Sequence, residues 1–253
     1  MSARTHYLRL LAILTVPLAL GSLGVSISAR AQPSQPFAVA GLFVELNDTD
    51  EDLGLHAEID GGTWTSLDID NPRGLPLLGI ASKGNLRSQG LTQLAFESAE
   101  PNFEDLDPDD FFQRFPEGVY DIKAIAQGGG TFKSQVLLSH VLAAPPEATV
   151  SGLPAAEDCD ATLPEVVAPV VIDWDEVTES HPDVGKAGPV TISRYQFFLE
   201  QGAMKLSLDL PPTVTAFEIP ANLTAAGGVF KFEIIARTST GNNTAIESCF
   251  RMQ

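Results

Sequence analysis

The sequence is poor in cations, in cysteines and in recognisable catalytic motifs. It has 15 lysines and arginines against 33 aspartates and glutamates, for a formal net charge of −18 at pH 7. Nucleic acids and anionic lipid surfaces also carry negative charge, so this balance argues against both as partners. The four histidines form no metal-type pair, and no nucleophile-elbow, zinc-protease or phosphate-loop pattern occurs. We therefore predict a protein that is not an enzyme, with a glycosidase-type pair of carboxylates as the open alternative.

Only two cysteines are present, Cys159 and Cys249. They are too few for a structural zinc site without histidines placed nearby. In an oxidising compartment the simplest expectation is a single disulfide between them, which would stabilise the fold by up to about 4.6 kcal/mol in the chain-entropy model. Two free buried thiols are the alternative.

Residues 1–31 have the features of a signal peptide. Arg4 and Arg9 form a basic start, residues 10–27 are mostly apolar, and residues 29–31 (Ala-Arg-Ala) match the small-x-small pattern that precedes cleavage. A proline and glycines within the apolar run make it a poor permanent anchor, although an uncleaved anchor is the alternative. We expect a secreted or periplasmic protein without a membrane span after cleavage.

A nine-residue pattern occurs twice, at residues 118–126 and 228–236. Both copies carry Gly, Val, Ile and Ala at the same offsets, and both alternate with the period of two that a half-buried strand requires. Tyr120 begins the apolar face of the first copy and Phe230 that of the second. A glycine-bearing turn follows each copy. We interpret the pattern as one β-sandwich unit built twice; the alternative is two unrelated hairpins.

Short apolar or alternating runs elsewhere predict further strands. They are residues 38–46, 55–59, 64–69, 76–81, 91–96, 132–142, 170–174, 195–200, 206–210, 216–219 and 245–250. The segment 60–62 (Asp-Gly-Gly) has the composition of a hairpin turn. One helix is predicted at residues 107–115, because Asp107 can cap it and Pro108 suits its first position. Regular short strands with little helical periodicity indicate an all-β fold.

The second half, residues 148–253, resembles a fibronectin type III domain. The residues that carry the likeness are Trp174, the run Tyr195-x-Phe197-x-x-Glu200, the run Phe230-x-Phe232-x-Ile234-x-Ala236, and Gly241. In that family the tryptophan and the alternating run pack against each other between two sheets. The family usually has a corner tyrosine where this chain has Phe230. In the first half, Tyr120 lies four residues after Pro116 and could keep the corner bond.

The first half resembles the N-terminal part of secreted bacterial proteins of unassigned function that also carry fibronectin-type modules. The residues are Asn47-x-Thr49-Asp50-x-Asp52-x-Gly54, then Asp60-Gly61 and Trp64, and Phe115-Pro116-Glu117-Gly118-x-Tyr120. This resemblance implies no known activity.

Together these features predict an all-β chain of two tandem Ig/fibronectin type III-like β-sandwiches after the signal peptide. The predicted parts are the signal peptide (1–31), an N-terminal β-sandwich domain with one short helix (32–142), a proline-rich linker (143–147) and a fibronectin type III-like β-sandwich (148–253). In such a sandwich the loop between the first two strands lies at the pole where the last strand ends. The resemblance therefore makes a bridge between Cys159 and Cys249 geometrically reasonable.

Asp48, Asp50 and Asp52 are candidate metal ligands, because they alternate in a loop without apolar residues. Alternate carboxylates can turn inward on one calcium ion, which takes six to eight oxygens. Leu53 and Ile59 stand where a helix-loop-helix calcium site would need glycine and glutamate. A solvated acidic loop is the alternative.

We predict an exported, non-catalytic binding or structural module that contacts a protein or glycan partner outside the cytoplasm. The alternatives are a calcium-dependent carbohydrate-binding accessory protein and a hydrolase with an unrecognised carboxylate site. Trp64 separates them: a ring stacked in an open groove favours sugar binding, and a buried ring favours the plain module.

Overall fold

The computed structural model describes residues 34–253, so the predicted signal peptide at residues 1–31 lies outside the described residues. The described part is mostly β. Within it, no helix has the length and apolar character needed to cross a bilayer.

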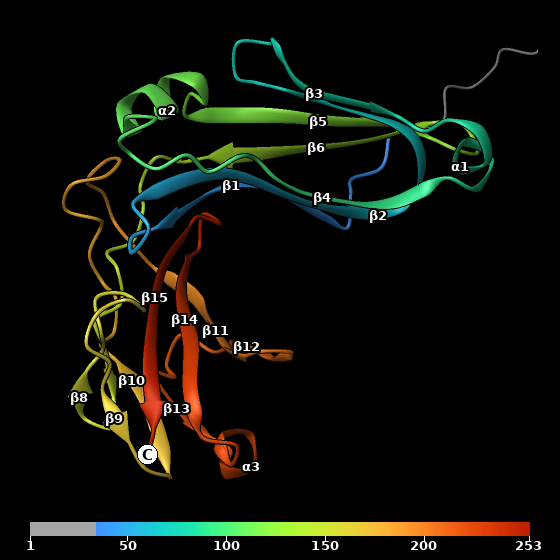
Figure 1. Cartoon of the computed structure of the whole chain (residues 1–253). Helices are drawn as coiled ribbons and strands as arrows, with labels where there is room; N and C mark the ends of the chain where they lie inside the picture. Colours follow the sequence, from blue (N-terminus) through green and yellow to red (C-terminus); the bar gives the residue numbers. More distant parts are fainter. Residues whose placement is uncertain (1–33) are drawn as a thin grey trace, which may run out of the picture. The chain divides into compact units, whose positions relative to one another are not determined.

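Most strands lie in one large sheet with the order β12-β11-β14-β15-β1-β2-β5-β6, in which β3 and β4 also pair with β2, and β9 pairs with β15. The strands of this sheet are β1 (Val39–Asn47), β2 (Asp52–Asp70), β3 (Pro76–Ala81), β4 (Leu91–Glu97), β5 (Gly118–Ala126), β6 (Thr131–Leu138), β9 (Glu165–Val166), β11 (Ile192–Gln201), β12 (Met204–Leu210), β14 (Gly228–Thr238) and β15 (Asn243–Met252). A second sheet has the order β13-β10-β7-β8, formed by β13 (Ala216–Ile219), β10 (Val170–Trp174), β7 (Ala148–Val150) and β8 (Leu153–Pro154). Figure 1 shows both sheets.

The two copies of the repeated pattern are β5 and β14, and each pairs antiparallel with the strand that follows it, β6 or β15. Of their predicted inward side chains, Tyr120, Ile122 and Ala124 in β5 are buried, as are Phe230, Phe232, Ile234 and Ala236 in β14. Ala126, at the end of β5, is half-buried. The Tyr120 hydroxyl donates a hydrogen bond to the Pro116 carbonyl oxygen at 3.0 Å, so the expected corner bond is present.

Both copies belong to the same sheet because β1 pairs parallel with β15. In this register Glu45 lies opposite Asn243 and Asn47 lies opposite Ala245. Two distinct hydrophobic cores nevertheless form, one around Trp64 and Tyr120 and the other around Trp174 and Phe230.

The predicted hairpin turn at residues 60–62 is wrong, because β2 continues through it as one strand. A Cβ atom added at Gly62 would lie 2.7 Å from Cζ of Phe132, and one added at Gly61 would lie 3.1 Å from Cδ1 of Phe37. The glycines therefore let two aromatic rings lie against the strand. At the same point β2 exchanges one partner for another: it pairs with β1 up to Asp60 and with β5 from Trp64 onward.

The predicted helix forms as α2 (Pro108–Arg114), and the Asp107 side chain accepts a hydrogen bond from the Asp109 amide, as a cap does. Two further short helices, α1 (Gly84–Gln89) and α3 (Ala221–Thr224), were not predicted. Neither has a side-chain cap, and α1 buries no residue, so neither leaves a clear pattern in the sequence.

The predicted linker, residues 143–147, is held by hydrogen bonds. Ala143 is buried, and its carbonyl oxygen accepts a bond from the Thr244 hydroxyl at 2.9 Å. The Ala144 amide donates to the Glu179 carbonyl oxygen at 2.9 Å. Whether this stretch separates two domains stays a prediction.

Candidate functional site

Acidic side chains gather on the outer face of the large sheet, around β1, β2, β14 and β15. We call this group the carboxylate cluster; its members are Glu45, Asp52, Glu100, Glu233 and Glu247. Strand alternation places them there. In β14, for example, Phe232 and Ile234 face the core, while the residue between them, Glu233, faces outward opposite Glu247 of β15.

The cluster is crowded enough to hold protons near neutral pH. Burial, followed by repulsion from Glu45 and Glu247, raises the pKa of Glu233 to about 7. Burial, followed by repulsion from Glu100, raises the pKa of Asp52 to about 6. Burial also raises the pKa of Glu100. Desolvation and repulsion between like charges both disfavour the ionised carboxylate, so the two effects raise these pKa values together.

His56 lies at one end of the cluster, between Glu45 and Glu100. Ligand atoms of these three residues all lie within 4.8 Å of one another. His56 Nε2 is 2.8 Å from Glu100 Oε1, and the His56 ring stacks on Phe43, its cross-strand neighbour, at a centroid distance of 5.4 Å. The Asn243 side-chain amide donates to Glu45 Oε2 at 2.5 Å.

Sequence reasoning missed this group. Glu45, His56 and Glu100 come from two strands and a loop, and His56 belongs to no metal-type pair in the sequence, which favours a surface or strand residue over a ligand. The pairing of β1 with β2 places Phe43 opposite His56 and Glu45 opposite Gly54. The sequence predicts the strands at 38–46 and 55–59 but neither their register nor the position of Glu100.

An open groove of about 520 Å³ extends from this group across the face of the sheet. Acidic and basic side chains both line it, including Glu45, Glu233, Arg194 and Arg237. The Arg237 guanidinium lies 4.4 Å from the centroid of the Phe43 ring, a cation–π arrangement. Burial lowers the pKa of Arg237.

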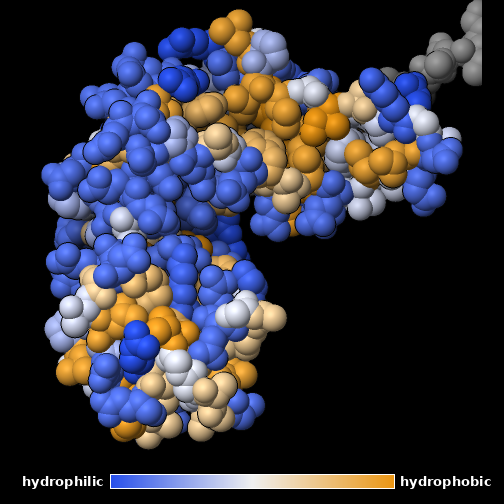
Figure 2. Space-filling model, viewed as in Figure 1, coloured by the Kyte–Doolittle hydropathy of each residue, from blue (hydrophilic) through white to orange (hydrophobic). Residues whose placement is uncertain are grey.

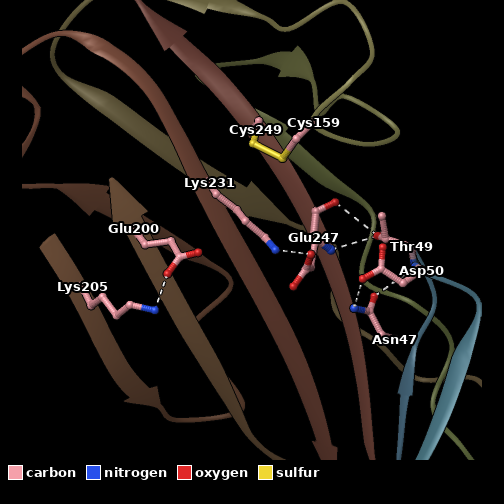
Figure 3. Close-up of polar contacts among 9 residues, drawn as sticks. All are labelled: Asn47, Thr49, Asp50, Cys159, Glu200, Lys205, Lys231, Glu247 and Cys249. Atoms are coloured by element: carbon pink, nitrogen blue, oxygen red, sulfur yellow. Dashed lines mark hydrogen bonds and ion pairs between the residues drawn. A yellow bond between two sulfur atoms is a disulfide. The ribbon is translucent and has the colours of Figure 1, made fainter. Parts of the chain in front are cut away.

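A neighbouring groove of about 320 Å³ is lined in part by two ion pairs. Lys205 contacts Glu200 at 2.7 Å, and Lys231 contacts Glu247 (Figure 3). The first pair is well exposed, so it adds little to stability. The arrangement presents both signs of charge to solvent.

The predicted metal ligands Asp48, Asp50 and Asp52 have different surroundings. Asp48 accepts a hydrogen bond from His181 Nε2 at 2.8 Å. Asp50 accepts one from the Asn47 amide at 3.0 Å, as Figure 3 shows. Asp52 begins β2 inside the carboxylate cluster. A calcium site shared by the three aspartates stays a prediction.

The predicted disulfide is present, joining Cys159 to Cys249 of β15 with a Cα–Cα distance of 5.0 Å (Figure 3). It holds the segment before β9 against the last strand. The Ser248 hydroxyl adds a hydrogen bond to the Ala156 carbonyl oxygen at 2.9 Å in the same region.

Both tryptophans belong to the interior. Trp64 has an exposed fraction of 0% and Trp174 of 2%. The large hydrophobic side chains that are exposed among the described residues are aliphatic. On the face that Figure 2 shows, hydrophobic residues gather where Figure 1 places β5, which carries the exposed Val119 and Ile125.

No protein-family model and no curated protein sequence matches the chain. Among solved structures, a bacterial ice-binding adhesin of 1.5 MDa is similar at 11% identity and a TM-score of 0.26, over 87% of this chain and 65% of that one. The human OSCAR ligand-binding domain is similar at 14% identity and a TM-score of 0.25, over 87% of this chain and 98% of that one. A tandem repeat from the extending region of a large adhesion protein shares 10% identity at a TM-score of 0.26, over 85% of this chain and 50% of that one. TM-scores this low carry no argument about fold or function, and the fibronectin type III assignment stays a prediction.

Proposed function

We propose that this chain is an exported, non-catalytic binding or structural module, built as two tandem β-sandwiches, that contacts a protein partner outside the cytoplasm. The observation that carries the proposal is the burial of Trp64. An aromatic ring can bind a sugar by stacking only when its face is open, and this ring lies in the first core.

Two further features support the proposal. The disulfide between Cys159 and Cys249 suits an oxidising compartment outside the cytoplasm. The two hydrophobic cores, one centred on each copy of the repeated strand, support a pair of sandwiches.

The outer face of β5 and β6 offers a contact surface for a protein. Val119 and Leu137 lie directly opposite each other and are 48% and 54% exposed, and Ile125 on the same face is 56% exposed. β6 ends the path of the large sheet. Asp121 and Lys123 lie between the Val119–Leu137 pair and Ile125, so the face combines exposed apolar and charged side chains, a mixture that a protein partner can contact.

Chemical crosslinking in the cells that produce the protein tests the proposal. We expect specific protein crosslinks to the wild-type chain, their loss in Leu137→Glu, and their retention in the control Val229→Glu, which changes an exposed residue of β14. Glycan binding without a protein crosslink, or hydrolysis that Glu233→Gln abolishes, would overturn it. N-terminal sequencing of the recovered protein tests export, since we expect the mature chain to begin at Gln32.

A further inference from the structure

We propose that Glu45, His56 and Glu100 form a binding site for a divalent transition-metal ion, with zinc as the best-fitting member. Zinc takes imidazole nitrogen and carboxylate oxygen together, whereas calcium and magnesium take oxygen. Two carboxylates balance the charge of such an ion. The inference does not depend on the proposed function.

The three side chains are positioned for a common ligand. Their candidate ligand atoms lie within 4.8 Å of one another. A tetrahedral zinc ion with bonds of about 2.0–2.2 Å keeps its ligand atoms about 3.3 Å apart. The contact between His56 and Glu100, now 2.8 Å, would therefore open only slightly, and the Glu100 side chain is 24% exposed and has room to move.

The imidazole ring of His56 is held in a fixed orientation, and a preoriented ligand favours metal binding. Its ring stacks on Phe43 with an interplanar angle of 20°. The side chain is only 13% exposed. Stacking and burial together direct Nε2 toward Glu100 before any ion arrives, so little ordering remains to be done on binding.

An independent observation comes from Asn243, which is 3% exposed. Its amide nitrogen donates to Glu45, but its Oδ1 atom is buried without a hydrogen-bond partner among the described residues. Leaving a buried acceptor unsatisfied costs about 1–3 kcal/mol. A half-turn of this amide group would exchange its nitrogen for Oδ1 beside Glu45, and amide oxygens are themselves metal ligands.

Gly54 makes room for the site. It lies opposite Glu45 in the sheet, and a Cβ atom added there would lie 1.8 Å from Glu100 Oε1. Its nearest neighbours are all atoms of the Glu100 side chain. Alanine at this position would therefore push Glu100 away from His56 and leave the strand itself unobstructed.

The surroundings attract cations. Glu58 and Glu97 line the same groove and add negative charge beside the three residues, and a concentration of like charge raises the local concentration of counterions. One arginine of the groove is engaged elsewhere: Arg237 donates through Nε to the Gly241 carbonyl oxygen and lies over Phe43.

Zinc titration of the chelator-treated mature protein tests the proposal, by calorimetry and by thermal melting. We expect one zinc ion per chain and a higher Tm with zinc. His56→Gln and Gly54→Ala should each weaken zinc binding by about tenfold or more. The matched control is Glu218→Gln, which removes one carboxylate from the exposed face of β13 in the other sheet and should bind zinc as the wild type does.

Three outcomes would overturn the proposal. They are the absence of saturable zinc binding, zinc binding that is unchanged in His56→Gln, and a preference for calcium over zinc. X-ray absorption at the zinc edge gives a readout that a merely structural role would not produce, since it should show one imidazole nitrogen in the wild type and none in His56→Gln. Glu100→Gln, which keeps the side-chain shape, should also lose zinc and so replaces Gly54→Ala if that variant folds poorly.

Discussion

At the scale of single residues, His181 shows how one buried side chain can organise a loop. Its Nδ1 atom accepts hydrogen bonds from the backbone amides of Asp183 and Val184 at 3.2 and 2.9 Å. Its Nε2 atom donates to Asp48 at 2.8 Å. The two accepted bonds fix the tautomer, because Nδ1 must be free of a proton.

We expect His181→Ala to lower the free energy of unfolding by about 1–3 kcal/mol, because it leaves two amides without an acceptor. Asp48→Ala leaves one donor, His181 Nε2, without its acceptor, and water can take the place of the partly exposed carboxylate, so this variant should cost less, about 1 kcal/mol. Urea unfolding of both variants provides the measurement. Equal losses in the two variants would contradict this account of the loop.

Glu233 should make the stability of the folded protein depend on pH. Its pKa is raised from 4.5 to about 7 in the folded state, so between these values the folded chain binds more protons than the unfolded chain. Stability from this group therefore rises as the pH falls from above 7 toward 4.5, and Asp52 acts in the same direction between 3.8 and about 6.

We expect Glu233→Gln to stabilise the protein at pH 8 by on the order of 1–3 kcal/mol and to flatten the dependence of Tm on pH. Glu218→Gln, at an exposed position, is the matched control. A wild-type Tm that falls steadily from pH 7 to pH 5, and falls equally in Glu233→Gln, would argue against a protonated Glu233.

At the scale of elements, most strand positions followed from the alternation of apolar residues. The predicted strands at 76–81, 170–174 and 216–219 match β3, β10 and β13 residue for residue. The cap at Asp107 predicts α2 in the same way, because capping, like strand alternation, depends on residues that are close together in the sequence. The turn wrongly predicted at residues 60–62 could not be recognised from neighbouring residues. The rings of Phe37 and Phe132, which lie against the two glycines, come from distant segments of the chain.

Among the features at this scale, the disulfide should contribute most to the free energy of unfolding. Cys159 and Cys249 are 90 residues apart in sequence, so the bridge restricts a long loop in the unfolded chain. Replacing both by serine should lower the free energy of unfolding by up to about 4.6 kcal/mol.

Urea unfolding of the wild type with and without reductant should reproduce most of that difference, and the double variant should no longer respond to reductant. If reduction leaves the unfolding midpoint unchanged, the bridge does not constrain the unfolded chain as this reasoning requires.

At the scale of the whole molecule, Asn242 links three segments. Its Oδ1 atom accepts from the Val44 amide at 3.0 Å, and its amide donates to the carbonyl oxygens of Ser139 and Val141 at 2.8 and 3.0 Å. The side chain is 1% exposed. Every one of these groups would be left unsatisfied without it.

We expect Asn242→Ala to cost about 3 kcal/mol or more, since three buried partners lose their bonds. In calorimetry we expect the wild type to unfold in one transition and the variant in two, one for each hydrophobic core. Asn222→Ala, at an exposed position of α3, is the control. A variant that still unfolds in one transition at the wild-type Tm would show that Asn242 does not couple the two cores.

The group of Glu45, His56 and Glu100 marks the limit of prediction from sequence at this scale. The acidic composition is evident in the sequence, and Asp48, Asp50 and Asp52 are candidates there because they are neighbours in the chain. The register between β1 and β2 depends on the packing of whole strands, and no spacing in the sequence encodes the approach of Glu100 over Gly54.

The parallel pairing of β1 with β15 has a consequence for how the chain reaches its folded state. Val44 and Asn242, which bond across this junction, are 198 residues apart in sequence. A ribosome would have to release nearly all of that intervening chain before β1 could meet its neighbour, and such distant contacts form slowly. The incomplete nascent chain would leave one side of β1 without a partner, and an unpaired strand edge is prone to misassembly until the last strand is made.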